Sequence, residues 1–354
     1  MRRSCKAVTV GKVAIGANAA VSVQSMTNTP TEDAEKTIVQ ICALEQAGCD
    51  IVRVSVYNQE CAAALCRIKQ QTKIPIVADI HFDYRLAIAA LENGADKLRI
   101  NPGNIQKPEQ ISAMVDCAKM HHTPIRIGVN AGSISKEIRE RYGITPQALV
   151  QSAMEHIRLL EQRHFQDIVV SVKASNVPMM IESYRLLAKE TGYPLHLGVT
   201  EAGDAMQGTI KSAIGIGALL LEGIGDTIRV SLTGDPVQEV VAAQHILRSV
   251  GLYHRGIEII SCPTCGRTRV DIQGMVEQIR KQCSDIFIPL KVAVMGCAVN
   301  GPGEASNADI GIAGGDGKGV LFENGQVIAS FEEEDLLSEL IRRIHVRQEQ
   351  QSQL

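Results

Sequence analysis

The sequence has 354 residues, of which 45% are hydrophobic, 21% are charged and only 3% are aromatic, and its formal net charge is −3. This composition is ordinary for a globular protein and excludes an extended disordered chain. Few aromatic rings and no excess of basic residues argue against a nucleic-acid-binding protein. At roughly 150 residues per domain, the length predicts two domains.

No stretch of the sequence is apolar for long enough to cross a membrane. The longest apolar run, Ala213–Leu221, is stopped by Glu222, whereas a spanning helix needs about 20 residues. The basic N-terminus has no signal-peptide core, because Lys6 and Lys12 interrupt it. We therefore expect a cytoplasmic protein whose ten cysteines stay reduced.

Short runs of apolar and β-branched residues alternate with segments of helical periodicity in the first two thirds of the chain. The eight runs that we predict as strands are Val21–Met26, Ile51–Val56, Pro75–Ile80, Lys97–Pro102, Pro124–Asn130, Ile168–Ala174, Leu195–Ala202 and Thr227–Thr233. The first intervening helix should open with the capping-box pattern Thr29–Glu32 and end at Gly48. Together these segments predict an α/β fold that begins with a (β/α)8 TIM-like barrel over residues 1–252. An open doubly wound sheet is the alternative, but no G-x-G-x-x-G follows the first strand.

A weak internal repeat places basic residues inside these predicted strands. The pattern Asp-x-apolar-Arg-apolar occurs at Asp50–Val54, Asp96–Ile100 and Asp226–Val230. Basic side chains in apolar strands are costly without a partner, and interior carboxylates such as Asp79 and Glu201 would pair with them one by one. We favour a polyanionic ligand for the whole set, which comprises Arg53, Arg99, Arg126, Lys173 and Arg229. In this fold such side chains would meet at the C-terminal ends of the strands, where arginine forks match phosphate oxygens.

The pattern changes after about residue 252. Strands are expected at Glu258–Ser261, Leu290–Met295 and Asp309–Ala313, with a helix near Val270–Gln282. Val320–Ser330 reads as a hairpin that turns at Asn324-Gly325, and Phe331–His345 as an amphipathic helix. These elements predict a smaller α+β domain over residues 253–354.

Three cysteines of this second domain are expected to lie close together. Cys262 and Cys265 follow one predicted strand, and Cys297 follows the next, in a glycine-rich segment that ends at Glu304. A [4Fe–4S] cluster fits three thiolates with one open iron that Glu304 could occupy. A zinc site, whose fourth ligand would have to be Cys283 or a distant His such as His254, and a redox Cys-x-x-Cys pair are the alternatives. We interpret Cys283 as a buried structural residue.

Several motifs of the sequence resemble those of a known family. The segments Cys262–Arg267 and Cys297–Glu304 closely resemble the signature of the bacterial 4-hydroxy-3-methylbut-2-enyl diphosphate synthase family. Val23–Thr29, Val77–Phe82 and Leu98–Asn104 are similar to segments of the same family. The resemblance extends over essentially the whole chain and matches the short two-domain bacterial form.

The resemblance implies a role for each candidate residue. Cys262, Cys265 and Cys297 would be thiolate ligands of one [4Fe–4S] cluster, with Glu304 as the carboxylate ligand of the resting state. The second domain would be similar to a domain of sulfite and nitrite reductases. The diphosphate-binding set would comprise Arg53, Arg99, Arg126, Asn130, Lys173, Arg229 and Ser231. Glu201 would assist proton transfer.

The resemblance also implies the reaction and the partners. The barrel would hold the substrate, 2-C-methyl-D-erythritol 2,4-cyclodiphosphate, and the unique iron of the cluster would bind it. Two electrons passed through the cluster would open the ring of the substrate and remove water. The product would be 4-hydroxy-3-methylbut-2-enyl diphosphate, an isoprenoid precursor. Flavodoxin or ferredoxin would donate the electrons to a homodimer. One alternative is a non-catalytic, metal-stabilised phosphate-binding module. Another is an aldolase that uses Lys173 as a Schiff base.

Overall fold

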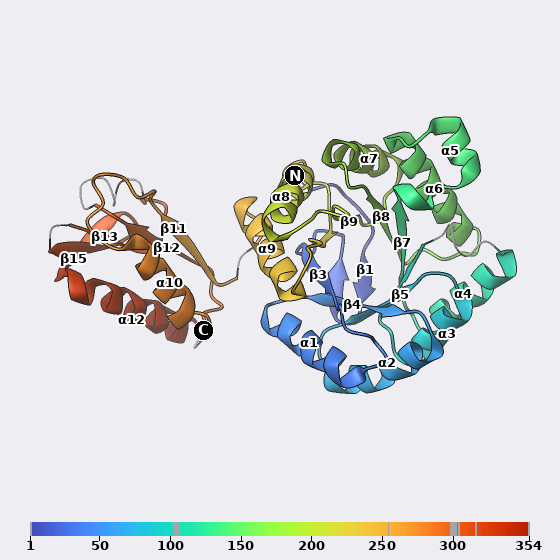
Figure 1. The fold of residues 1–354 in the computed structure, drawn as a ribbon, viewed down its shortest axis with the longest axis horizontal. Helices are drawn as coiled ribbons and strands as arrows, with labels where there is room; N and C mark the ends of the chain where they lie inside the picture. Colours follow the sequence, from blue (N-terminus) through green and yellow to red (C-terminus); the bar gives the residue numbers. More distant parts are fainter. Residues whose placement is uncertain are drawn as a thin grey trace. The chain divides into compact units, whose positions relative to one another are not determined.

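The computed structural model describes residues 2–101, 107–253, 255–297, 303, 305–315 and 317–352. The chain divides after Leu252 into two compact units, which are considered separately (Figure 1). No helix among these described residues is long and apolar enough to cross a membrane.

The first unit is a ring of eight parallel strands. They are β3 (Ser22–Met26), β4 (Ile51–Val56), β5 (Ile76–Ile80), β6 (Lys97–Ile100), β7 (Ile125–Asn130), β8 (Ile168–Lys173), β9 (His196–Leu197) and β10 (Thr227–Ile228). Their order in the sheet is β8-β7-β6-β5-β4-β3-β10-β9. A parallel bridge between Val170 of β8 and Leu195, just before β9, brings the two ends of the sheet together. The predicted TIM-like barrel is therefore confirmed.

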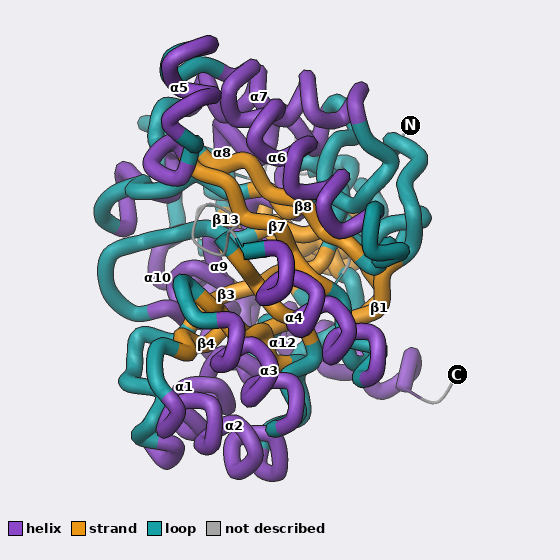
Figure 2. The backbone as a smooth tube through the Cα atoms, turned by 90° about the vertical axis from the view of Figure 1, so that its right-hand side faces the viewer, coloured by secondary structure: helices purple, strands orange, loops and turns teal. Residues whose placement is uncertain are grey.

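Helices cover the outside of this ring, as Figures 1 and 2 show. They are α1 (Ala34–Gln46), α2 (Gln59–Gln71), α3 (Tyr84–Glu92), α4 (Pro108–Met120), α5 (Lys136–Tyr142), α6 (Pro146–Glu161), α7 (Val177–Glu190), α8 (Ala205–Leu221) and α9 (Pro236–Ser249). The predicted start of α1 is wrong, because its N-cap is Asp33 and not Thr29. The Thr29 hydroxyl bonds to Thr37 and the Glu32 carboxylate accepts from Tyr57, so neither side chain is available to cap the helix. Its end before Gly48, where φ is +87°, is as predicted.

The aspartates of the internal repeat fix the register of the barrel strands. Asp50 Oδ2 accepts the backbone N–H of Val23 at 2.8 Å, on the neighbouring strand. In the same way, Asp96 accepts from Ile76 at 2.7 Å and Asp226 from Leu195 at 2.9 Å. Each aspartate thus satisfies an otherwise unpaired donor at the start of the adjacent strand. The arginine of each repeat follows three residues later.

Two features of the barrel differ from the prediction. The last two strands are much shorter than Leu195–Ala202 and Thr227–Thr233, because the chain leaves the ladder near Gly198. A Cβ at Gly198 would lie 2.5 Å from Lys173 Nζ, so the Lys173 side chain occupies the space beside this backbone. The chain does not continue the sheet at this point. In addition, an unpredicted hairpin of β1 (Val8–Val10) and β2 (Val13–Ile15) contributes to an apolar cluster with the barrel residues Ile51 and Val77.

The second unit is a five-stranded mixed sheet packed against helices. Its strands are β11 (Ile257–Ser261), β12 (Leu290–Met295), β13 (Ile310–Gly314), β14 (Lys318–Glu323) and β15 (Gln326–Glu332), and its long helices are α10 (Ile272–Gln282) and α12 (Glu333–Ser352). The first three strands run parallel and the last three antiparallel. The hairpin turns at Asn324-Gly325, both at positive φ, as predicted. Helix α12 begins two residues later and ends seven residues later than predicted.

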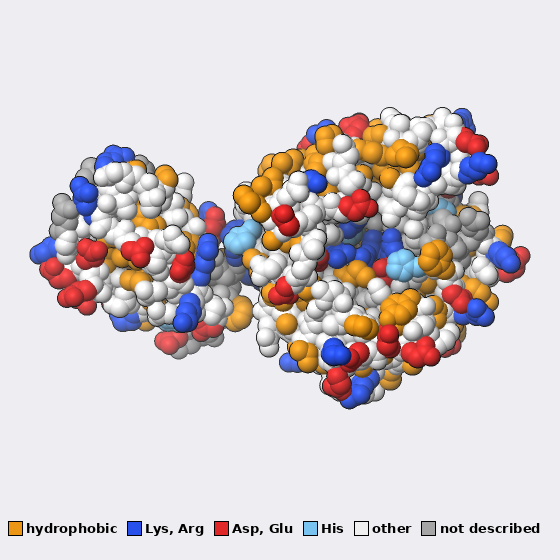
Figure 3. All heavy atoms as spheres, in the orientation of Figure 1, with side chains coloured by type: hydrophobic (Ala, Val, Ile, Leu, Met, Phe, Trp, Pro, Cys, Tyr) orange, Lys and Arg blue, Asp and Glu red, His pale blue; other side chains and the backbone are white. Residues whose placement is uncertain are grey.

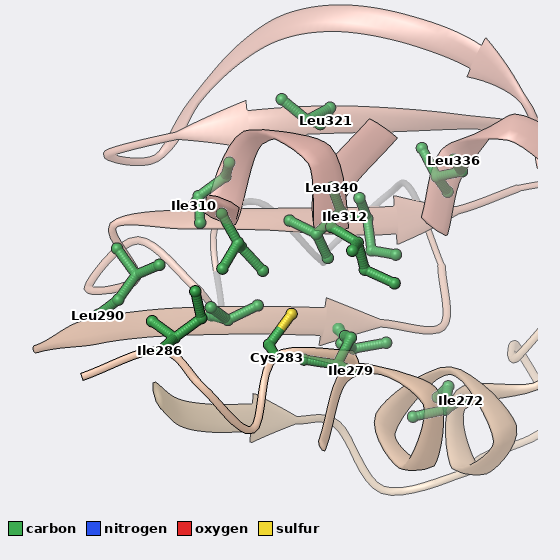
Figure 4. Packing of buried hydrophobic residues seen from close by; sticks show 14 of the residues in the cluster. Ile272, Ile279, Cys283, Ile286, Leu290, Ile310, Ile312, Leu321, Leu336 and Leu340 are labelled. Carbon is green, nitrogen blue, oxygen red and sulfur yellow. The ribbon is translucent and has the colours of Figure 1, made fainter. Parts of the chain in front are cut away.

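Apolar side chains from the sheet and from both long helices form the core of this unit (Figure 4). Ile279 and Leu340 belong to the helices, and Val292 and Ile312 to the sheet. Cys283 is buried among them and is 5% exposed, so its thiol serves as a small apolar core residue.

Candidate functional site

A cavity of about 380 Å³ opens among the C-terminal ends of the barrel strands. Its lining includes all seven residues of the predicted diphosphate-binding set, which are Arg53, Arg99, Arg126, Asn130, Lys173, Arg229 and Ser231. Met26, Asp79, His81, Ser171 and Thr200 line it too. Figure 3 shows lysine and arginine side chains at the bottom of this hollow in the barrel. Residues far apart in the sequence thus converge on one basic cavity.

Asp79 pairs with two of these arginines. Its carboxylate accepts from Arg99 at 3.0 Å and lies 3.6 Å from Arg53 Nε, and it is only 2% exposed. Burial alone would raise the pKa of Asp79, but Arg53, Arg99 and His81 outweigh it and lower the pKa to about 2. The alternative considered for single arginines, pairing with an interior carboxylate, therefore holds at Asp79.

A second carboxylate, Glu239 on α9, pairs with Arg229 and was not predicted. Glu239 is 4% exposed and accepts from Arg229 at 3.1 Å, from the Ser25 hydroxyl at 2.8 Å and from the backbone N–H of Leu232 at 3.1 Å. It fixes both the guanidinium and the loop that carries Ser231. In the sequence, the only sign of this role is that Glu239 lies in the first turn of a helix that follows a strand. Acidic residues are common at such positions, so the sign is not specific.

The remaining cations have no carboxylate partner among the described residues. Arg126 is 1% exposed and donates to the Ser171 hydroxyl at 2.6 Å, while its Nε and Nη2 have no hydrogen-bond partner there. Burial, together with the nearby arginines, lowers the pKa of Lys173 well below its ordinary value. Five basic groups thus share two carboxylates, and the cavity carries an excess of positive charge that a multiply charged anion would neutralise.

Glycines and loop ends shape the rim of the cavity. A Cβ at Gly128 would lie 2.6 Å from Arg99 Nε, so only glycine lets the guanidinium pass the β7 backbone. Asn130 ends β7 and begins a 3-10 turn, in which its backbone N–H donates to the Ser133 hydroxyl at 3.0 Å. Residues 102–104, the end of the family-like segment Leu98–Asn104, lie outside the described residues.

The structure does not place Glu201 in the lining of the cavity. Glu201 is exposed and directly follows Thr200, which does line it. Its backbone lies in the left-handed region, with φ of +53°. Such strain at a residue other than glycine is characteristic of functional sites. The position of Glu201 on the rim therefore leaves it a candidate, while the arginines Arg53, Arg99 and Arg229 pair with Asp79 and Glu239.

The second unit brings Cys262 and Cys297 to the same edge of its sheet. Strands β11 and β12 are parallel and in register, with Ser261 opposite Val294, so Cys262 follows one strand end and Cys297 the other. The backbone N–H of Gly296 donates to Cys262 Sγ at 3.2 Å. Such N–H donors stabilise thiolates in metal sites.

Cys265 lies in the exposed turn after Cys262, where its backbone N–H donates to Thr268 Oγ1. Hydrogen bonds from the backbone and side chain of Arg267 lower the pKa of the Cys265 thiol, which favours the thiolate that binds metal. Glu304, the predicted fourth ligand, lies outside the described residues. Among the described residues, no three His, Cys, Asp or Glu side chains already lie close enough to hold a metal ion.

The fold and the cavity define a two-unit α/β protein, with a barrel whose basic mouth suits a small polyanion and a mixed-sheet unit that carries a thiol-rich edge. Residues 5–244 match the profile described as the GcpE TIM-barrel domain, and residues 258–346 match the GcpE protein C-terminal domain. The chain belongs to the GcpE family.

Two curated relatives show how close the similarity is. The chain is 57% identical over 345 residues to the 4-hydroxy-3-methylbut-2-en-1-yl diphosphate synthase (flavodoxin) of Caldanaerobacter subterraneus subsp. tengcongensis, with 97% of each chain covered. It is 56% identical over 344 residues to the enzyme of the same name from Clostridium perfringens, covering 97% of this chain and 99% of that one. The family resemblance expected from the motifs is confirmed.

One solved structure is similar to part of this chain. The dihydropteroate synthase of Yersinia pestis superposes with a TM-score of 0.49 and 13% identity over 70% of this chain and 99% of that chain. This likeness says nothing about function.

Proposed function

We propose that this chain is a 4-hydroxy-3-methylbut-2-en-1-yl diphosphate synthase that acts on 2-C-methyl-D-erythritol 2,4-cyclodiphosphate. The observation that carries the proposal is the convergence of five basic side chains on one cavity of about 380 Å³, in a chain that belongs to the GcpE family. The substrate gains two electrons and one proton, the ring C–O bond to phosphate breaks, and one hydroxyl leaves as water. The linear diphosphate product carries one more negative charge than the cyclic substrate.

The basic cavity has two tasks in this reaction. Arg53, Arg99 and Arg229, held by Asp79 and Glu239, orient the diphosphate before the chemistry begins. Arg126 and Lys173, the two basic groups of the cavity without a carboxylate partner in the described structure, then stabilise the charge that grows as the ring opens. Asn130 and Ser231 donate further hydrogen bonds at the rim.

We further propose that Cys262, Cys265, Cys297 and Glu304 hold one [4Fe–4S] cluster. The parallel strand ends, the N–H donor to Cys262 Sγ and the lowered pKa of Cys265 support this ligand set. When bound, such a cluster supplies electrons one at a time and a Lewis-acidic iron. The relatives' name points to flavodoxin as the electron donor, and ferredoxin is the other candidate.

Glu201 is proposed as the residue that assists proton transfer. Because its side chain lies on the rim and not among the phosphate-binding groups, Glu201→Gln should leave the Kd for the cyclodiphosphate unchanged. Turnover should fall by about 100-fold, as expected for loss of a general acid. Steady-state kinetics and calorimetry with Glu182→Gln as the exposed control test this, and unchanged turnover would exclude the role.

A homodimer is the expected assembly. Helix α8 exposes a stripe of apolar side chains at helical spacing, with Met206, Ile210 and Ile214 each more than half exposed. Such a surface suits packing against a second copy. Light scattering should give twice the 38.3 kDa chain mass, and Ile210→Glu should shift the protein toward the monomer. A single-chain mass for the unmodified protein contradicts the assembly.

The proposed reaction is tested by anaerobic turnover of the cyclodiphosphate with a low-potential reductant. We expect the linear allylic diphosphate to accumulate in step with consumption of reductant. Binding of the cyclodiphosphate without turnover, in protein that contains its full complement of iron, would favour the non-catalytic binding module.

A further inference from the structure

One buried lysine takes no part in the anion cavity. Lys97, the first residue of β6, is fully buried, and its Nζ has no hydrogen-bond partner among the described residues. Side chains alternate along a strand, so Lys97 shares the inward face of β6 with Arg99. Arg99 lines the cavity, but Lys97 does not. A buried ammonium without a partner is costly, so this position requires an explanation.

The surroundings of Lys97 contain apolar and basic groups. On one side, Lys97 is in register with Val77, which packs with Val10 and Ile15 of the N-terminal hairpin. Arg53 of β4 lies beyond Val77 in the same register, and Arg126 belongs to β7, the strand on the other side of β6; both repel a charged Lys97. Burial and these two arginines hold the pKa of Lys97 well below its ordinary value.

The other titratable groups that face this layer do not balance the charge. Asp79 of β5, one residue pair further along the barrel, is already engaged by Arg53, Arg99 and His81. His196 of β9 is fully buried, and burial together with the nearby cations lowers its pKa, so its ring stays neutral. On β3, Met26 continues the register of Arg53, and buried polar residues of β3 and β10 such as Gln24 and Thr227 carry no charge.

We propose that Lys97 is a proton acceptor beneath the anion cavity, a neutral amine while the cavity is empty and an ammonium once a diphosphate fills it. The inference rests on the proposed function, because it needs an anion to bind in the cavity. A bound diphosphate offsets the charges of Arg53 and Arg126, and their repulsion is what disfavours the ammonium. The amine lone pair then takes one proton from solvent, and no other bond changes. Ring opening adds a negative charge and holds the proton in place.

Calorimetric titration of the full-length, anaerobically purified protein with inorganic pyrophosphate tests the proposal. Titrations at pH 8 in buffers of different ionisation enthalpy give the number of protons taken up on binding. Lys97→Met has a similar size and cannot titrate, so it should take up about one proton fewer than the unmodified protein while still binding pyrophosphate. Lys36→Met, at an exposed helix position, is the matched control and should leave the count unchanged.

Two outcomes separate this inference from the proposed function. Equal proton counts in Lys97→Met and in the unmodified protein overturn the role of Lys97 but leave the anion site intact. Failure of the unmodified protein to bind pyrophosphate overturns both.

A second measurement follows the free protein. A lysine whose folded pKa lies below its unfolded pKa binds fewer protons when folded, so stability rises with pH up to the unfolded pKa of about 10.4. Lys97→Met should flatten this rise and raise the unfolding temperature most at the lower pH values. Equal destabilisation by Lys97→Met at every pH would show a purely structural role and contradict the proposal.

Discussion

Replacement of Cys297 or Cys262 with serine is expected to remove most of the iron and to reduce turnover by more than about 100-fold. The reason is that each is proposed as a thiolate ligand at the end of one of two neighbouring parallel strands. Changes to groups outside the ligand shell already cost about 10- to 100-fold in metal affinity or activity, so loss of a ligand should cost more. Iron analysis of oxygen-free protein and anaerobic kinetics measure both effects.

Cys283→Ala is the matched control in the same unit. Its thiol lies in the apolar core and is 5% exposed, and it is not one of the proposed ligands. The variant should lose about 1 kcal/mol of stability through the small cavity it leaves, while iron content and turnover stay unchanged. A Cys297→Ser protein that keeps full iron would overturn the proposed ligand set.

Arg126→Met is expected to weaken binding of the cyclodiphosphate by about 10- to 100-fold, the value of a charged hydrogen bond. The same variant should stabilise the free protein by about 1 kcal/mol or more. Arg126 is fully buried among like charges, and two of its nitrogens have no partner in the described structure, so methionine of similar length removes an uncompensated cation. Calorimetry gives the affinity and thermal unfolding gives the stability.

These opposite effects distinguish a binding residue from a structural one. Arg85 serves as the control, because it pairs with Asp83 on the surface and its side chain is 70% exposed. Arg85→Met should change stability by less than about 0.5 kcal/mol and leave binding unchanged. If Arg126→Met lost stability and kept its affinity, the guanidinium would support the barrel and would not bind the anion.

Most of the barrel could be predicted because each strand carries a local signal. A buried parallel strand is a short apolar run, and here an aspartate precedes several of the runs and an arginine interrupts them. Asp50 and Asp96 bond to the neighbouring strand, while Arg53 and Arg99 point into the cavity. The aspartate of the repeat therefore indicates the register of the barrel strands, and the arginine indicates the position of the cavity.

The parts that could not be predicted depend on contacts between distant segments. Glu239 looks like any acidic residue in a first helical turn, and only the folded barrel places it against Arg229. The strands of the hairpin Val8–Ile15 are too short to give a clear sequence pattern. The hairpin packs against Ile51 and Val77 of the barrel, which only the folded chain brings near it. Glu201 was considered as a partner for a single arginine, but the chain leaves the strand near Gly198 and Glu201 lies on the rim of the cavity.

We propose that the thiolates of Cys262, Cys265 and Cys297 in the second unit hold an iron–sulfur cluster. Metal analysis of the full chain, purified and reconstituted without oxygen, tests it most directly. We predict about four irons per chain and a broad absorption near about 400 nm that reductant bleaches. A colourless protein that binds one zinc ion and no iron would contradict it.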